Sequence, residues 1–187
     1  LVVSSNRSVM CDAIVRVYDG NYVLSANAEF FDNTMSHIGD NDDNNYHYSN
    51  FSCLINTTYD VGKYQIRCGF NLTYYSNPGT WRCSLNVTDM NNLLINSSVT
   101  TSINQLLGIG VDDYIDYGSV GSYSVSDEHI VNVTNYGNVK INLSLSGYGM
   151  YVGDNNSMNC TSGNISIMYE KYNLTSSNIV TTLSSFE

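Results

Sequence analysis

Hydrophobic and polar residues alternate with a period of two along much of this chain. In the segment 66–72 every second residue is apolar, in the order Ile, Cys, Phe and Leu, and Asn71 falls on the other side. The segment 81–87 repeats the pattern with Trp, Cys, Leu and Val on one side and Asn86 on the other. The alternation recurs in the second half, over 139–145. Because successive side chains of a strand point to opposite faces, these segments predict β-strands with one buried face.

Helices are not expected, because no stretch of a dozen residues shows apolar spacing at i, i+3, i+4 and i+7. Gly/Asn/Asp turns such as 19–21 and 135–138 separate strands of six to ten residues, which is typical of immunoglobulin-type sandwiches. The Ser/Thr-rich stretch 97–104 follows an apparent last strand and suggests a domain boundary. The chain is therefore predicted to be all-β, with two tandem immunoglobulin-like β-sandwich domains, 1–104 and 105–187.

The tripeptide Asn-X-Ser/Thr, the acceptor motif for N-linked glycans, is unusually frequent. The 26 Asn residues of the chain would give roughly five such motifs by chance. The twelve acceptors are Asn6, Asn50, Asn56, Asn71, Asn86, Asn96, Asn132, Asn142, Asn155, Asn159, Asn164 and Asn173. Four of them fall on the polar side of alternating segments: Asn71, Asn86, Asn142 and Asn164. The excess predicts a glycosylated extracellular protein; the alternative is an Asn/Ser/Thr-rich surface without sugar.

Charge narrows the range of partners. The chain contains only 7 Lys and Arg but 17 Asp and Glu. The resulting net charge of −10 repels phosphate backbones and anionic lipids. Nucleic acid is therefore not an expected partner. The longest apolar run, 106–111, is far shorter than the roughly twenty residues of a membrane span. The chain begins at Leu1 without Met or a basic segment, which suggests a mature form or a fragment without its signal peptide.

No motif in the chain predicts catalysis or a cofactor. The three histidines, His37, His47 and His129, belong to no nucleophile elbow or metal pair and are interpreted as surface or packing residues. An enzyme is therefore not expected. The acidic segment 39–45 offers Asp40, Asp42 and Asp43 as a candidate Ca²⁺ site, but the spacing does not match an EF-hand. A solvated loop rich in Asp and Asn is the favoured alternative.

Two longer segments resemble a known type of module. The stretch 77–89 reads NPGTWRCSLNVTD, with an aromatic residue two positions before a Cys, as in the F strand of immunoglobulin domains. It is similar to the P-G-T-Y/W and V-T-D signature of PKD-type and related Ig-like modules of archaeal cell-surface proteins. The stretch 8–20 resembles the B strand of such modules, and 116–120 with 131–139 is similar to their N-x-G-N repeats. The resemblance implies adhesion, spacing, surface-layer or filament roles.

The same layout implies a pattern of disulfides. Cys11 and Cys83 would form the bridge from the B strand to the F strand through the core. Cys53 and Cys68 lie about equally far from a turn at 59–63 and can oppose each other across a hairpin. Cys160 would stay free or bond another chain. The neighbouring acceptor Asn159 is the doubtful one, because a buried or bonded Cys160 would hinder access to it. The alternative is that the cysteines are reduced and packed as small apolar groups.

The ends of the chain suggest how such a protein assembles. The segments 1–3 and 179–183 are rich in β-branched and apolar residues, so either could add to an open sheet edge of a neighbouring subunit. We therefore expect a homopolymer, either a cell-surface filament or a surface layer. The alternatives are that both ends close their own sheets, or that the chain is a monomeric carbohydrate- or partner-binding module of a larger secreted protein.

Overall fold

The computed structural model describes residues 5–18, 20–91, 94–174 and 184–185. Almost all its regular structure is β, as the alternation predicts. The strands in these residues are β1 (Arg7–Arg16), β2 (Val23–Asp32), β3 (His47–Asn50), β4 (Leu54–Asp60), β5 (Lys63–Leu72), β6 (Gly79–Asp89), β7 (Leu94–Ile103), β8 (Ile109–Gly110), β9 (Thr134–Asn135), β10 (Asn156–Cys160), β11 (Gly163–Ser166), β12 (Lys171–Tyr172) and β13 (Ser184–Ser185). The one helical element in the described residues is a 3-10 turn, η1 (Ile167–Tyr169). None of the described residues forms a helix with the length and hydropathy of a bilayer span.

The chain divides into two compact units. The first comprises Leu1–Gly110 together with Thr134–Lys140, and the second comprises Val111–Val133 together with Ile141–Glu187. The first unit therefore includes the segment Thr134–Lys140, which the sequence analysis, with its boundary at residue 104, assigns to the second domain.

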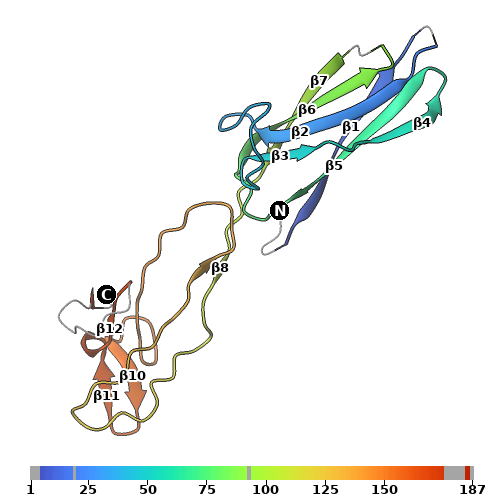
Figure 1. The fold of residues 1–187 in the computed structure, drawn as a ribbon. Helices are drawn as coiled ribbons and strands as arrows, with labels where there is room; N and C mark the ends of the chain where they lie inside the picture. The colour runs from blue at the N-terminus through green and yellow to red at the C-terminus, as the bar shows by residue number, and fades with distance from the viewer. Residues whose placement is uncertain (1–4, 19, 92–93, 175–183, 186–187) are drawn as a thin grey trace. The chain divides into compact units, whose positions relative to one another are not determined.

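Two antiparallel sheets make up most of the first unit (Figure 1). One has the order β1-β5-β4 and the other has the order β3-β2-β6-β7. The sheets pack face to face, because the buried side chains of both belong to one hydrophobic cluster. The alternation in 66–72 and 81–87 is confirmed: the apolar residues are buried, Asn71 is exposed and Asn86 is half-buried.

Aromatic residues fill the centre of this core. Trp81 is 0% exposed, and its ring centroid lies 4.9 Å from that of Phe30. The indole of Trp81 stays hydrogen-bonded, since Nε1 donates to the carbonyl oxygen of Asn77 at 2.8 Å. Beside it, the buried carboxylate of Asp32 accepts hydrogen bonds from Thr34 and Asn77. Burial alone would raise the pKa of Asp32, but these hydrogen bonds outweigh burial and lower it.

The segment Thr134–Lys140 returns to the first unit and pairs there through β8 and β9. Gly137 lies so close to the backbone of Leu106 that an added Cβ would clash with the carbonyl oxygen of that residue. The next residue, Asn138, accepts a hydrogen bond from Leu106 N–H and donates to the carbonyl oxygens of Ser76 and Asn104. Only glycine fits at position 137, because the backbone of Leu106 approaches it closely. The side chain of Asn138 makes the backbone hydrogen bonds that a neighbouring strand would otherwise make.

The second unit has a different character. Its described strands form only two-stranded pairs, β10 with β11 and β12 with β13. The strand predicted over 139–145 is wrong, because this segment joins no sheet and Leu143 is 54% exposed. Alternation selects the face of a strand but supplies no neighbouring strand to pair with. A second sandwich is accordingly not confirmed.

Candidate functional site

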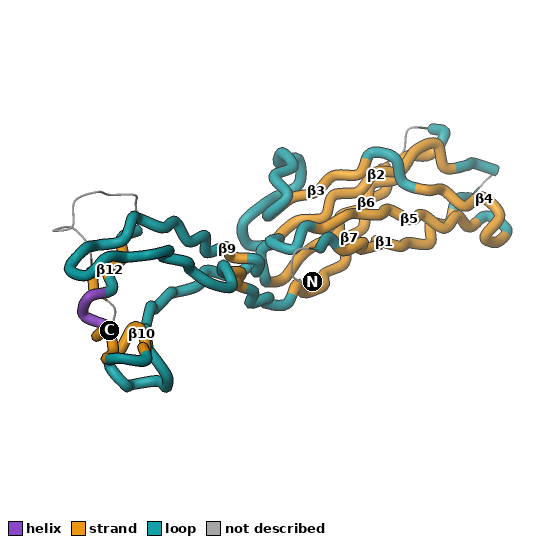
Figure 2. The backbone as a smooth tube through the Cα atoms, turned by 90° about the horizontal axis from the view of Figure 1, so that it is seen from below, coloured by secondary structure: helices purple, strands orange, loops and turns teal. Residues whose placement is uncertain are grey.

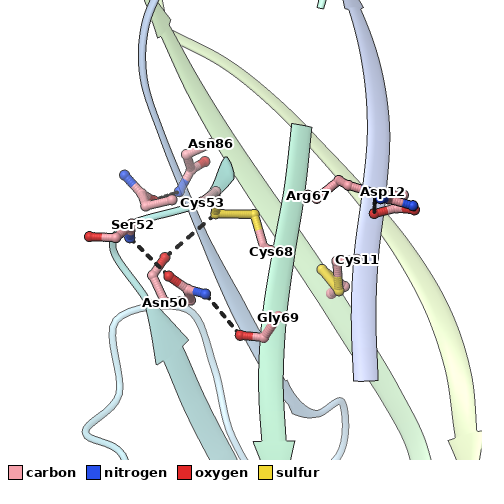
Figure 3. The surroundings of a disulfide bond; sticks show 11 residues. Cys11, Asp12, Asn50, Ser52, Cys53, Arg67, Cys68, Gly69 and Asn86 are labelled. Carbon is pink, nitrogen blue, oxygen red and sulfur yellow. Dashed lines mark hydrogen bonds and ion pairs between the residues drawn. A yellow bond between two sulfur atoms is a disulfide. The ribbon is translucent and has the colours of Figure 1, made fainter. Parts of the chain in front are cut away.

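Two disulfides tie the first unit together. Cys11 of β1 bonds Cys83 of β6 and so joins the two sheets through the core, with the Cα atoms 6.4 Å apart. Cys53 bonds Cys68 of β5, with the Cα atoms 4.5 Å apart (Figure 3). These pairs coincide with the two that the sequence analysis gives. Cys11 and Cys68 are also register partners in the β1–β5 ladder, so the two bridges are adjacent.

Cys160 belongs to the second unit and is the last residue of β10. It is free in the described part of the chain and exposed, which removes the reason for doubting Asn159 as an acceptor. Asn159 itself is exposed and pairs directly with Asn164 across the hairpin of β10 and β11.

All twelve glycan acceptors lie within the described residues, and none is buried. The exposed ones are Asn6, Asn71, Asn96, Asn132, Asn142, Asn155, Asn159, Asn164 and Asn173. The half-buried ones are Asn50, Asn56 and Asn86. An oligosaccharide needs solvent around the amide nitrogen, so each exposed acceptor, taken singly, is sterically compatible with modification.

Two half-buried acceptors already use the amide nitrogen that would carry the sugar. Asn50 Nδ2 donates to the carbonyl oxygen of Gly69 at 2.8 Å, while Asn50 Oδ1 accepts from the N–H of Ser52 (Figure 3). Asn86 Nδ2 donates to Asn27 Oδ1 at 3.3 Å. Modification at Asn50 would have to displace a hydrogen bond that holds the segment leading to Cys53. The sequence motif alone does not distinguish these positions from the exposed ones.

The acidic loop 39–45 turns its carboxylates toward the protein's own donors. Asp43 accepts from the N–H groups of Asn45, Tyr46 and His47, and Asp40 accepts from the N–H of His37. Partial burial would raise the pKa of Asp43, but the backbone hydrogen bonds outweigh it and lower the pKa. Among the described residues, no group of three or more His, Cys, Asp or Glu side chains is arranged to hold a metal ion. The loop therefore matches the Asx-rich alternative more closely than a Ca²⁺ site.

His47 has a structural role that its sequence surroundings did not reveal. It is 1% exposed, and its Nε2 and Nδ1 lie 3.1 Å from Glu29 Oε2 and Asp42 Oδ1 respectively. The imidazole thus links β2, β3 and the acidic loop. It is a packing histidine, one of the two roles left open by the sequence. Its two carboxylate partners, Glu29 and Asp42, lie 18 and 5 residues away, so no local motif indicates them.

The first unit has a cavity between β1 and β7. Each of these two strands is the last strand of its sheet (Figure 2). Together with β6 they line the cavity, which has a volume of about 200 Å³. Core residues Leu85 and Val87 form part of its lining. The sheet with three strands ends at β1, so its described strands leave the inner face of β7 without cover.

Val99 shows how incomplete this side is. It is the register partner of Cys83, so both side chains point toward the core side of the sheet. Cys83 is 3% exposed, but Val99 is 61% exposed. A residue on the inner face of a strand is thus open to solvent, beside a ten-residue strand β1 that has a described strand partner on one side only.

Comparison of the chain with protein-family models, with curated proteins and with solved structures gave no match. The features that bear on function are therefore the open side between β1 and β7, the two disulfides and the surface acceptors. An open strand edge can accept a further strand, and solvent-facing acceptors can carry sugar.

Proposed function

We propose that this protein is a glycosylated extracellular structural protein, a subunit of a cell-surface filament or surface layer that self-associates by β-strand addition. The observation that carries the proposal is the 61% exposure of Val99 on the inner face of β7, opposite Cys83, which is bonded to Cys11 of the edge strand β1. A strand from a second copy, hydrogen-bonded to β1, would extend that sheet over β7. It would bury Val99 and close the cavity beside Leu85.

The strand order supports an immunoglobulin-like first domain with one position unfilled. In that fold strands A, B, E and D form one sheet, and C and F lie with G in the other. If β1 is B and β6 is F, then β5 and β4 take the places of E and D. The position next to β1 is that of strand A, which no described strand fills.

The accepting strand β1 carries Arg7, Asp12 and Arg16, whereas β7, over which the added strand would lie, lacks the usual protection against association. Native edge strands are commonly blunted by Lys, Pro or inward-pointing charge. The ten residues of β7 contain no charged residue and no Pro. Glycans on the outward faces would resist face-to-face packing, whereas they leave the strand edges accessible. Disulfides favour an oxidising compartment, in agreement with an extracellular location.

The source of the added strand is proposed from sequence. The β-prone segments 1–3 and 179–183 lie outside the described residues, and either could extend to a neighbour. We expect the N-terminal segment to be the donor, because it is apolar and free of charge.

A matched pair of substitutions on β7 tests the acceptor side. Val99→Lys places a charge on the inner face, where the added strand would lie, and should abolish polymers in negative-stain images and sedimentation. Thr100→Lys, on the next exposed residue and the opposite face, should leave polymers intact. Both positions are exposed in the subunit, so neither change should unfold it; circular dichroism checks this.

The donor side is tested by deleting residues 1 to 5, which should abolish polymer assembly.

Two outcomes would contradict these proposals. If Val99→Lys assembles as readily as Thr100→Lys, the β1–β7 side is not the contact. If the glycosylated wild-type protein stays monomeric at high concentration, the filament proposal fails altogether. A monomeric binding module would then be the better description, and glycan-array binding would support it.

A further inference from the structure

We infer that Asn96 carries a glycan seated on the outer face of the sheet β3-β2-β6-β7, beside Arg82, and that the opposing acceptor Asn86 stays unmodified. The inference rests on the proposed glycosylation and adds which acceptor is used and where its sugar lies.

The two acceptors compete for one space. Asn86 of β6 and Asn96 of β7 are register partners, so their Cβ atoms are about 5 Å apart on the same face. A folded sheet has room for one oligosaccharide at such a pair. Asn96 is exposed on the edge strand, whereas Asn86 is half-buried and its Nδ2 donates to Asn27. Asn96 is therefore the accessible member.

A polar cavity of about 270 Å³ adjoins Asn96 on this face. Its lining residues are Ile38, Arg82, Ser84, Asn96, Ser97 and Ser98. Ser84 and Ser98 are register partners in the row next to Asn86 and Asn96, so their side chains share the outer face. Hydroxyl groups and one aliphatic side chain suit the mixed polar and apolar surface of a sugar ring.

Arg82 gives the cavity a donor in need of an acceptor. Its Nε is buried and has no hydrogen-bond partner in the described part of the protein. No ion pair with a described carboxylate involves this guanidinium group, although the chain carries 17 Asp and Glu. Buried donors are almost always satisfied in native proteins. Asn86, in the row of Asn96, is four residues from Arg82, about 13 Å along the strand, so an outer sugar of the glycan would reach the half-buried Arg82 side chain. A shift of that side chain would then let the buried Nε donate to the sugar.

Glycopeptide mass measurement tests which acceptor is used. No Lys or Arg lies between Arg82 and Lys140, so trypsin releases residues 83–140 as one peptide after reduction. In an Asn132→Gln variant expressed in the native cells, this peptide contains only Asn86 and Asn96 as acceptors. We expect at most one glycan per peptide. Further cleavage before Asp89 separates the two acceptors and should place the glycan on Asn96.

The outcomes separate this inference from the proposed function. Absence of sugar from all twelve acceptors would contradict the glycoprotein proposal itself. The glycoprotein proposal would stand if sugar were found at other acceptors. The inference would nevertheless be overturned by any of three results for this peptide: two glycans, a glycan on Asn86 alone, or no glycan.

A double-mutant cycle tests the seating of the sugar. In the protein with its glycan on Asn96, Arg82→Gln should lower Tm by about 4 °C more than the same substitution does in an Asn96→Gln variant. The variant has already lost the contact between the glycan and Arg82, so the second substitution cannot remove it again. Asn71→Gln is the matched control, since Asn71 is an exposed acceptor on β5 of the other sheet; its effect should add to that of Arg82→Gln. Additive effects of Arg82→Gln and Asn96→Gln would show that the glycan does not contact Arg82.

Discussion

The two compact units of this chain use similar residues in different ways. In the first, Phe30, Ile66 and Trp81 are at most 1% exposed, and their side chains meet between two sheets. In the second, no described residue is buried, and Tyr169 and Leu143 are 73% and 54% exposed. Burial of apolar area is the main favourable term in folding, so the first unit carries most of the stability.

Local hydrogen bonds, rather than a core, organise the described part of the second unit. Asp154 accepts from the N–H groups of Gly149, Met150, Tyr151 and Asn156, which closes the turn before β10. Such contacts form within a few residues of chain and do not depend on distant segments. The second unit should therefore open at lower free energy than the first.

The largest expected effect comes from truncating the centre of the first core. Trp81→Ala should lower the free energy of unfolding of the first unit by about 4 kcal/mol, because a large buried ring is lost and a cavity remains. Tyr169→Ala in the second unit should change stability by less than about 0.5 kcal/mol. Amide hydrogen exchange measured for each unit separately checks both values. Equal effects in the two units would contradict the contrast between them.

Removal of the smaller disulfide loop ranks next. The double variant Cys53→Ala/Cys68→Ala should lose about 3 kcal/mol of stability, the value for a loop of 15 residues. Cys160→Ala removes an exposed free thiol from the second unit and should have no measurable effect. Urea unfolding followed by circular dichroism compares the three proteins. If Cys160→Ala lost as much stability as the double variant, the Cys160 thiol would also stabilise the fold.

The smallest effect concerns pH and the turn of the second unit. Hydrogen bonds from backbone N–H groups, first that of Asn156 and next that of Met150, lower the pKa of Asp154 from 3.8 to about 2. Since the folded-state value is the lower one, the stabilisation is fully present above pH 4 and is lost as the pH falls through about 2. Asp154→Asn should remove this pH dependence. NMR titration of the carboxyl group measures it directly, and a pKa near 3.8 would contradict the turn.

Much of the first unit could be predicted from the sequence, because local pattern and long-range partners agree there. The strands around Ile66 and Trp81 and both cysteine pairs follow from alternation and from the resemblance to Ig-like modules. The pattern over 139–145 is just as regular, yet it gains no partner. Period-two spacing fixes which side chains share a face, whereas pairing depends on an available edge elsewhere in the chain.

The open side and the acceptor pairs were beyond sequence reasoning for a related reason. The exposure of Val99 depends on the number of strands in the opposite sheet, and nothing in β7 itself encodes that number. The opposition of Asn86 and Asn96 depends on the register of β6 with β7. A shift of one residue would have placed the two acceptors on opposite faces. The outward direction of Asn86 was predictable, but its competitor was not.

The bridge between Cys11 and Cys83 has a mechanical consequence. It encloses 72 residues of chain, which would span roughly 250 Å if fully extended. A molecule stretched by its two ends cannot release that length while the bridge is intact, even if both sheets are pulled apart. Tension applied outside the loop passes through a covalent bond instead of through the β1–β5 and β2–β6 ladders. Single-molecule extension before and after reduction would differ by about that length, because the stretch from Cys11 to Cys83 cannot extend under tension while the bridge is intact.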